Sequence, residues 1–332
     1  MKKQKVLISA GLILTSFLAA CESTEPAVQI DNEVACTDGS FHDADFSPIV
    51  GGKRVVEGSW VARKTVFLLS TAGDGSACTA TLIDQDVILT AAHCVDTALK
   101  EPEKLIAVFS ARPQCDADNK SIVSKMVQAK EIRMHEGYDA EGSSLGGADL
   151  ALVKLAKPAP ATAEIVELKD SDTPWTSYDR VLIAGYGRTL GGSAEETKPL
   201  SLRAVVRQPL IGESLKTVRE GVRNHVLKEM SDSFATMWLD WIFESGTDSE
   251  KVWLDQTDRR GACSGDSGGP AFVFENGKIK QLGVASSVLT GANPEDTCLI
   301  ASSYTNVLKY KTWISENYQT LTGRDASRLF SK

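Results

Sequence analysis

The chain has 332 residues, of which 42% are hydrophobic and 24% are charged, and these proportions are typical of a globular protein rather than a membrane bundle. A chain of this length is sufficient for about two domain-sized units. The net charge of -8 and the lack of clustered Lys and Arg exclude a nucleic-acid-binding surface, so no nucleic-acid partner is expected.

The first twenty residues have the pattern of a secretory signal peptide. The basic start MKKQK is followed by an apolar run from Val6 to Ala20, which is too short for a comfortable membrane span. The run ends in Leu-Ala-Ala before Cys21, which resembles the lipobox of bacterial lipoproteins. An ordinary signal cut near Ala20, beside an incidental cysteine, is the alternative. We therefore expect an extracytoplasmic protein, either secreted or attached to the bacterial cell envelope only through lipid on Cys21.

The other cysteines favour an oxidising compartment. Apart from Cys21, six of the seven cysteines remain, an even number without a CxxC pair. Three disulfides are the simplest interpretation, and a zinc site is the competing use. The spacings lack the close ligand pairs of structural zinc sites, so we predict no metal and no cofactor. The six residues are Cys36, Cys78, Cys94, Cys115, Cys263 and Cys298.

The segment 21–48 is acidic and has no apolar periodicity, so it is predicted to be a linker or propeptide. From Ile49 onward, short β-branched runs alternate with turn residues, a pattern typical of β-barrels or sandwiches. The predicted strand segments are KTVFLLS (64–70), ATLIDQDVILTAA (80–92), EKLIAVFS (103–110), ALVKL (151–155), DRVLIAGYG (179–187) and AFVFENGKIKQLGVASS (271–287).

Three further sequence patterns predict one turn and two helical stretches. Glu275-Asn276-Gly277 lies between strand-like residues and predicts a tight hairpin. Apolar residues at helical spacing predict a helical stretch over Glu213 to Phe243 and another over Val307 to Tyr318.

The stretch GACSGDSGGP, residues 261–270, places Ser267 between glycines, where it could be a nucleophile or part of a flexible turn. The motif also fits the GxSxG elbow of α/β-hydrolases. In that class the acid and the histidine follow the serine, whereas the last histidine here is His225, so the order excludes it. The subtilisin order of acid, histidine and serine has candidate aspartates before His93 but no supporting motif.

The order that remains is histidine, aspartate, serine. TAAHC (90–94) follows an apolar strand, ADLALVKL (148–155) begins a buried strand with an aspartate, and GDSGGP (265–270) contains the serine. Together with IVGG (49–52), these motifs resemble those of the trypsin/chymotrypsin-fold serine proteases. The sequence YTNVLKYKTWI (304–314) is similar to that family's last strand and closing helix.

The resemblance implies an all-β, chymotrypsin-like fold of two antiparallel six-stranded β-barrels with a C-terminal helix. It covers residues 49–318, which are expected to form the protease domain, with 319–332 as a C-terminal tail. The segment around 213–256 is longer than in compact family members and is expected to be a helical insertion at the cleft or at a partner site.

By the same resemblance, the chain is a serine endopeptidase that acts on proteins or peptides through an acyl-enzyme. Ser267 would be the nucleophile, His93 its general base, and Asp149 the carboxylate that orients the imidazole. The backbone N–H groups of Gly265 and Ser267 would form the oxyanion hole. An enzymatically silent or zymogen-locked surface lipoprotein that acts as a binding module is the alternative function.

The family also implies two disulfides, Cys78 with Cys94 and Cys263 with Cys298. Elimination then leaves Cys36 with Cys115, a pair that is not a family match. A further implication is activation by cleavage before Ile49, whose new amine would pair with Asp266. Because Pro48 precedes Ile49, an activator that cuts after Arg or Lys would not fit, and a different activating protease is expected.

Alignment with the family places Gly261 at the base of the substrate pocket, with Val288 and Ser302 on its walls. Ser286 would begin the substrate-binding strand and form a hydrogen bond near Asp149. A pocket base without a carboxylate does not compensate a buried cation, so cleavage after small to medium uncharged residues is predicted.

Overall fold

The structure is a computed structural model. The predicted signal peptide, Cys21, Cys36 and the predicted linker or propeptide lie outside the residues that it describes, as does the Cys115 side chain. The described residues are 49–118, 121–139, 147–188, 201–227, 231–243, 249–289 and 298–330.

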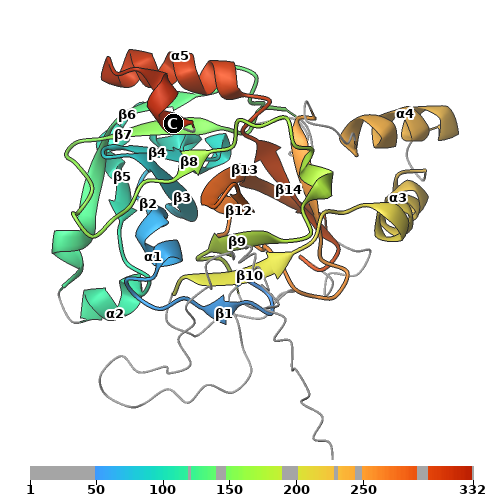
Figure 1. Cartoon of the computed structure of the whole chain (residues 1–332), viewed down its shortest axis with the longest axis horizontal. Coiled ribbons are helices and arrows are strands. Elements are labelled where there is room, and N and C mark those ends of the chain that lie inside the picture. The colour runs from blue at the N-terminus through green and yellow to red at the C-terminus, as the bar shows by residue number, and fades with distance from the viewer. Residues whose placement is uncertain are drawn as a thin grey trace, which may run out of the picture.

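The first half of the chain forms a closed antiparallel barrel of six strands (Figure 1). Its strands follow the order β2-β3-β4-β7-β6-β5, and pairing of β2 with β5 closes the ring. Strand β4 (VILT) is buried along its whole length, in keeping with its three successive apolar residues. The strands are β2 (Thr65–Ser70), β3 (Ser76–Asp84), β4 (Val87–Thr90), β5 (Leu105–Val108), β6 (Met126–Met134) and β7 (Ala151–Leu155).

The second half is an eight-stranded sheet in which six strands follow the order β10-β9-β12-β13-β14-β11. An isolated bridge between Pro209 and Leu254 brings the two ends of this path together. The predicted chymotrypsin-like all-β fold is confirmed. The strands are β9 (Val181–Gly185), β10 (Arg203–Arg207), β11 (Lys251–Asp255), β12 (Pro270–Glu275), β13 (Lys278–Leu289) and β14 (Ala301–Asn306), with β1 (Lys53–Arg54) beside β10 and β8 (Glu167–Leu168) parallel to β13.

The predicted hairpin joins β12 to β13. Glu275 pairs with Lys278, and the two residues between them have positive φ angles, 53° for Asn276 and 77° for Gly277. Two successive left-handed residues match the twist of the flanking strands, and Asn-Gly is the sequence that adopts this turn at least cost.

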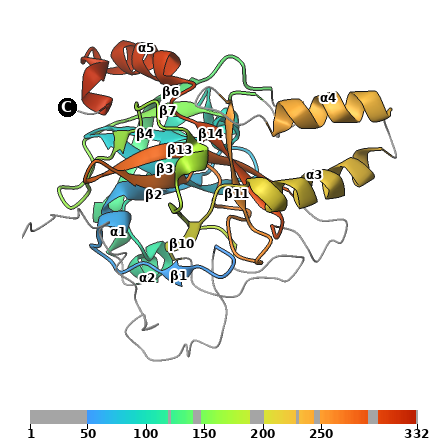
Figure 2. The same ribbon diagram turned by 45° about the vertical axis from the view of Figure 1, so that its right-hand side comes forward.

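The predicted helical stretch over Glu213 to Phe243 forms two helices, α3 and α4, which project from the side of the second sheet (Figures 1 and 2). The Trp253 indole on β11 donates to the Ile242 carbonyl and fixes the end of α4. No helix in the described ranges is long and apolar enough to cross a membrane. The helices are α1 (Trp60–Lys64), α2 (Pro113–Asp118), α3 (Gly212–Val226), α4 (Asp232–Ile242) and α5 (Lys311–Thr322), and the short 3₁₀ helices are η1 (Ala92–Cys94), η2 (Asp96–Ala98), η3 (Pro102–Lys104), η4 (Ile122–Lys125), η5 (Trp175–Ser177) and η7 (Ala326–Leu329).

The end of the chain packs on the first barrel instead of forming a separate tail. The boundary expected after Tyr318 falls inside α5, and η7 continues the packing with Leu329 and Phe330, both buried in the core of the first barrel. The Tyr318 hydroxyl donates to the buried Asp84 carboxylate, which Arg324 also contacts. Residues 319–330 are therefore part of the folded domain.

The side chain of Leu329 is 1% exposed, so its truncation leaves a cavity in the core. We expect Leu329→Ala to lower the free energy of unfolding by about 2 to 5 kcal/mol. The matched control is Leu99→Ala, because Leu99 is 40% exposed and should lose less than about 1 kcal/mol. Equal losses for the two variants in urea unfolding would contradict the packing of the C-terminal segment.

Candidate active site

His93 and Asp149 come together because the strands that precede and follow them are paired. His93 lies in η1, just after β4, and Asp149 lies just before β7. Antiparallel pairing of Thr90 with Ala151 places these two strand ends side by side. The His93 Nδ1 atom is 2.8 Å from Asp149 Oδ2, and the His93 backbone N–H donates to Oδ1 at 3.1 Å. This confirms that the fold brings the two residues into contact.

The Asp149 carboxylate is 4% exposed and is also held by the second half of the molecule. Ser286 on β13 donates its hydroxyl to Oδ2 at 2.8 Å, as predicted. Thr305 on β14 donates to the Asp149 main-chain carbonyl at 3.0 Å. Both ends of the Asp149 residue are thus fixed from across the interface between the two halves.

The pair has opposite pKa shifts that keep the carboxylate ionised. Burial alone would raise the pKa of Asp149, but the hydrogen bond and charge of His93 and the nearby Lys251 ammonium lower it. Burial opposes the charged form of His93, but the hydrogen bond and charge of Asp149 raise its pKa overall. An ionised carboxylate can only accept, so Nδ1 carries the proton and Nε2 is left as the proton acceptor.

Ser267 and Gly265 lie on a loop that is hydrogen-bonded to the first barrel through Thr79 on β3. The Thr79 backbone N–H donates to the Ser267 carbonyl at 2.8 Å, and its hydroxyl donates to the Gly265 carbonyl at 3.0 Å. Within the described part of the chain, neither the Gly265 nor the Ser267 N–H donates to a protein acceptor. Both residues are only half-buried.

Gly265 adopts a conformation that other residues rarely take. Its φ angle is 96°, and a Cβ at this position would lie 2.9 Å from the Gly187 Cα. A larger residue would strain the backbone and push this turn away from its neighbour.

A pocket of about 250 Å³ opens beside Ser267. Three of the residues predicted for the substrate pocket, Ser286, Val288 and Ser302, line it, whereas Gly261 does not. The lining comes from the Ser267 loop, from β13 and from β14. It consists of Ala262, Cys263, Ser264, Asp266, Ser267, Ala285, Ser286, Ser287, Val288, Ser302 and Ser303.

The space beside Gly261 is filled by Gln256, which sequence reasoning did not identify. A Cβ at Gly261 would lie 2.1 Å from the Gln256 side-chain carbonyl carbon. The Gln256 amide nitrogen donates to the carbonyls of Ala262 and Cys298, and its oxygen accepts from the Ala262 N–H. A neutral amide with its polar atoms engaged therefore occupies the position next to Gly261.

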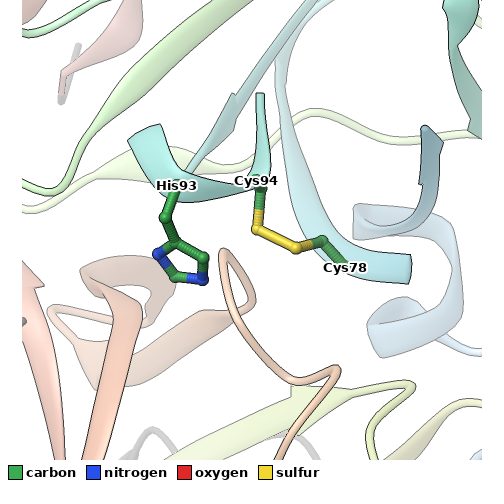
Figure 3. Close-up of side chains that lie close together, drawn as sticks. All are labelled: Cys78, His93 and Cys94. Atoms are coloured by element: carbon green, nitrogen blue, oxygen red, sulfur yellow. A yellow bond between two sulfur atoms is a disulfide. The ribbon is translucent and has the colours of Figure 1, made fainter. Parts of the chain in front are cut away.

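Two of the predicted disulfides are confirmed. Cys78–Cys94 joins β3 to the His93 helix (Figure 3), and Cys263–Cys298 joins the Ser267 loop to the segment before β14. The predicted Cys36–Cys115 disulfide lies outside the described side chains.

Cys78, His93 and Cys94 offer ligand atoms within 4.8 Å of one another (Figure 3). The two sulfur atoms are bonded to each other, so they do not form the thiolates that a metal site requires.

The residues predicted to act in activation lie on neighbouring segments. Ile49 is completely buried in the core of the second sheet, and Val50 forms a bridge with Gly261 just before the Ser267 loop. Asp266 is also buried. Its two carboxylate oxygens accept from the N–H groups of Gly187 and Cys263, each at 2.8 Å.

Comparison with known proteins assigns the fold to a family. The sequence matches the family described as Trypsin over residues 49–233 and 242–314, which is more than half of the chain. The chain belongs to the trypsin family. The two matched ranges are separated by residues 234–241, which fall within α4.

Similarity to individual members of the trypsin family extends over most of the chain. Chymotrypsin-like elastase family member 1 of Bos taurus is 24% identical over 270 residues, covering 80% of this chain and 88% of the relative. A trypsin-like protease of Streptomyces glaucescens is 26% identical, with coverage of 83% and 84%. Brachyurin of Leptuca pugilator is also 26% identical, with coverage of 83% and 99%.

A solved structure supports the fold. HL collagenase superposes with a TM-score of 0.56 at 20% identity, covering 81% of this chain and 98% of that structure. This similarity concerns the fold alone, which is the chymotrypsin-like arrangement described above.

Proposed function

We propose that this member of the trypsin family is a serine endopeptidase that hydrolyses peptide bonds through an acyl-enzyme on Ser267. The observation that carries the proposal is the hydrogen bond between His93 and the ionised Asp149. The loop of the partly exposed Ser267 packs against the strand end that precedes His93, since a Cβ on Gly268 would contact Thr90 and Ala91. Membership of a serine protease family supports the same chemistry.

In the proposed reaction, Nε2 of His93 takes the hydroxyl proton of Ser267 as Oγ bonds to the scissile carbonyl carbon. The oxygen that becomes negative would accept from the N–H groups of Gly265 and Ser267, and one such donor is typically worth about 3 kcal/mol. The C–N bond then breaks, and imidazolium returns the proton to the leaving amine. Water hydrolyses the acyl-enzyme by the same steps.

The proposed substrate preference is for small to medium uncharged residues. The pocket has serines and Val288 on its walls. By alignment, Gly261 occupies the position where trypsin-like members of the family carry a carboxylate, and the neutral Gln256 side chain fills the space beside it. Asp266 also lines the pocket, but its carboxylate oxygens accept from the backbone N–H groups of Gly187 and Cys263. An unpaired Lys or Arg side chain would be costly to bury there.

The proposal is tested with a peptide library and a fluorophosphonate probe. We expect the active protein to cleave after Ala, Val, Thr or Leu and to react with the probe, and we expect Ser267→Ala to lose both. Dominant cleavage after Arg or Lys would overturn the proposed specificity. A wild-type protein with a free Ile49 amine that neither reacts nor cleaves would support the binding-module alternative instead.

Activation is proposed to follow cleavage between Pro48 and Ile49, after which the new α-ammonium would pair with Asp266. The burial of Ile49 and the proximity of Val50 to the Ser267 loop support this step. Removing one partner of a buried ion pair typically costs about 3 to 5 kcal/mol. Asp266→Asn should therefore lose most of the activity, and amino-terminal sequencing of active enzyme should begin at Ile49. Full activity in a chain that retains Pro48 would contradict this mechanism.

We further propose that residues 1–20 are removed and that lipid on Cys21 anchors the protein to the cell envelope from outside the cytoplasm, with 21–48 as the linker or propeptide. We expect the wild-type protein to partition into detergent and Cys21→Ser to be released or to remain unprocessed. Unchanged partitioning of that variant would leave a secreted or otherwise attached protein as the explanation.

A further inference from the structure

A lysine is buried beside Asp149, although the proposed reaction does not use it. Lys251 is the first residue of β11, and it is only 3% exposed. Its ammonium nitrogen lies 3.0 Å from the Ser286 hydroxyl oxygen and 3.2 Å from that of Thr305. A buried lysine is unusual because removing an ammonium group from water is costly unless it is hydrogen-bonded or paired.

The hydrogen bonds of Lys251 have a fixed direction. A protonated amine can only donate, so both hydroxyls accept from Lys251 and must direct their single protons elsewhere. The Ser286 proton goes to the Asp149 carboxylate, and the Thr305 proton goes to the Asp149 carbonyl. One ammonium therefore orients both hydroxyls that hold Asp149.

We propose that Lys251 is a positioning residue for the Asp149–His93 pair, which it controls by orienting Ser286 and Thr305 and by placing a positive charge next to the carboxylate. The role rests on the proposed function, since it matters for catalysis only if His93 acts as the general base. The effect of the Lys251 charge on the titration of His93 can be measured in a protein that does not hydrolyse substrate.

The charges around Lys251 determine whether its protonation raises or lowers the pKa of His93. Burial lowers the pKa of Lys251 to about 8, against the attraction of Asp149 and Glu250. The Lys251 charge in turn lowers the pKa of His93, while Asp149 and Asp96 raise it. Tyr138 is a further titratable group near the carboxylate, and its pKa is raised to about 12, by burial first and then by Asp149. Protonated Lys251 thus keeps the imidazole neutral to lower pH.

The arrangement does not make Ser286 a second nucleophile activated by Lys251. Such a dyad would need the serine proton to pass to a neutral amine. Here that proton is donated to Asp149, and the ammonium itself donates to the serine oxygen. Lys251 therefore acts through Asp149 and not on a substrate.

The first test follows the histidine resonances of the Ser267→Ala protein by NMR as pH is raised. We expect the His93 resonances to show a second inflection near pH 8, as Lys251 loses its proton, and we expect Lys251→Arg to lack it because a guanidinium does not titrate there. A His93 titration without this inflection, or with the same inflection in Lys251→Arg, would overturn the coupling. Loss of the proposed peptidase activity would not affect this result.

The second test compares the pH dependence of kcat/KM, normalised to probe-reactive enzyme, in Lys251→Met and Lys251→Arg. Removing the positive charge should raise the pKa of His93, so the acid limb of Lys251→Met should move to higher pH by about half a unit or more. Lys251→Arg keeps the charge and should keep the acid limb near that of the wild type. If the acid limb of a folded Lys251→Met protein stays at the wild-type pH, Lys251 has only a packing role. If that variant does not fold, the NMR titration tests the proposal instead.

Discussion

The buried Asp149 carboxylate is the point on which the alignment of the two halves depends. It belongs to the first barrel, yet it accepts hydrogen bonds both from His93 in the same half and from Ser286 in the other. Thr79 reinforces the contact by holding the carbonyls of Gly265 and Ser267 from β3. A shift between the halves would break all of these hydrogen bonds. The geometry of the site therefore depends on how the two halves pack against each other.

Sequence was sufficient for those features whose residues are neighbours of a recognisable strand or turn. His93 and Asp149 each adjoin an apolar strand, and their contact follows once β4 pairs with β7. The Asn276-Gly277 turn was predictable because few sequences tolerate two successive positive φ angles. Gly265 lies within the GDSGGP motif, so its role was also predictable from local sequence. The order of the histidine, aspartate and serine motifs along the chain made that assignment specific.

The remaining features depend on groups that are distant in sequence. The sequence around Thr79 and Gln256 does not indicate their roles. Each side chain donates to a backbone carbonyl that is distant in sequence and comes close only in the folded protein. Lys251 was not identified from the sequence, because its hydrogen-bond partners, Ser286 and Thr305, lie on two other strands. Residues 319–330 were predicted to lie outside the domain because the sequence does not show what they contact. Arg324 and Arg328 form ion pairs with Asp84, and Leu329 and Phe330 are buried in the core of the first barrel.

The two ends of the domain are exchanged between its halves. The β1 strand near the start, Lys53–Arg54, pairs with β10 in the second sheet, whereas α5 and η7 at the end complete the core of the first barrel. Each half therefore uses a segment from the opposite end of the domain, and the core of the first barrel stays incomplete until the chain as far as Phe330 is present. Such nonlocal contacts slow folding, because long loops must close first. A domain whose two ends are exchanged in this way should therefore fold as one unit and not half by half.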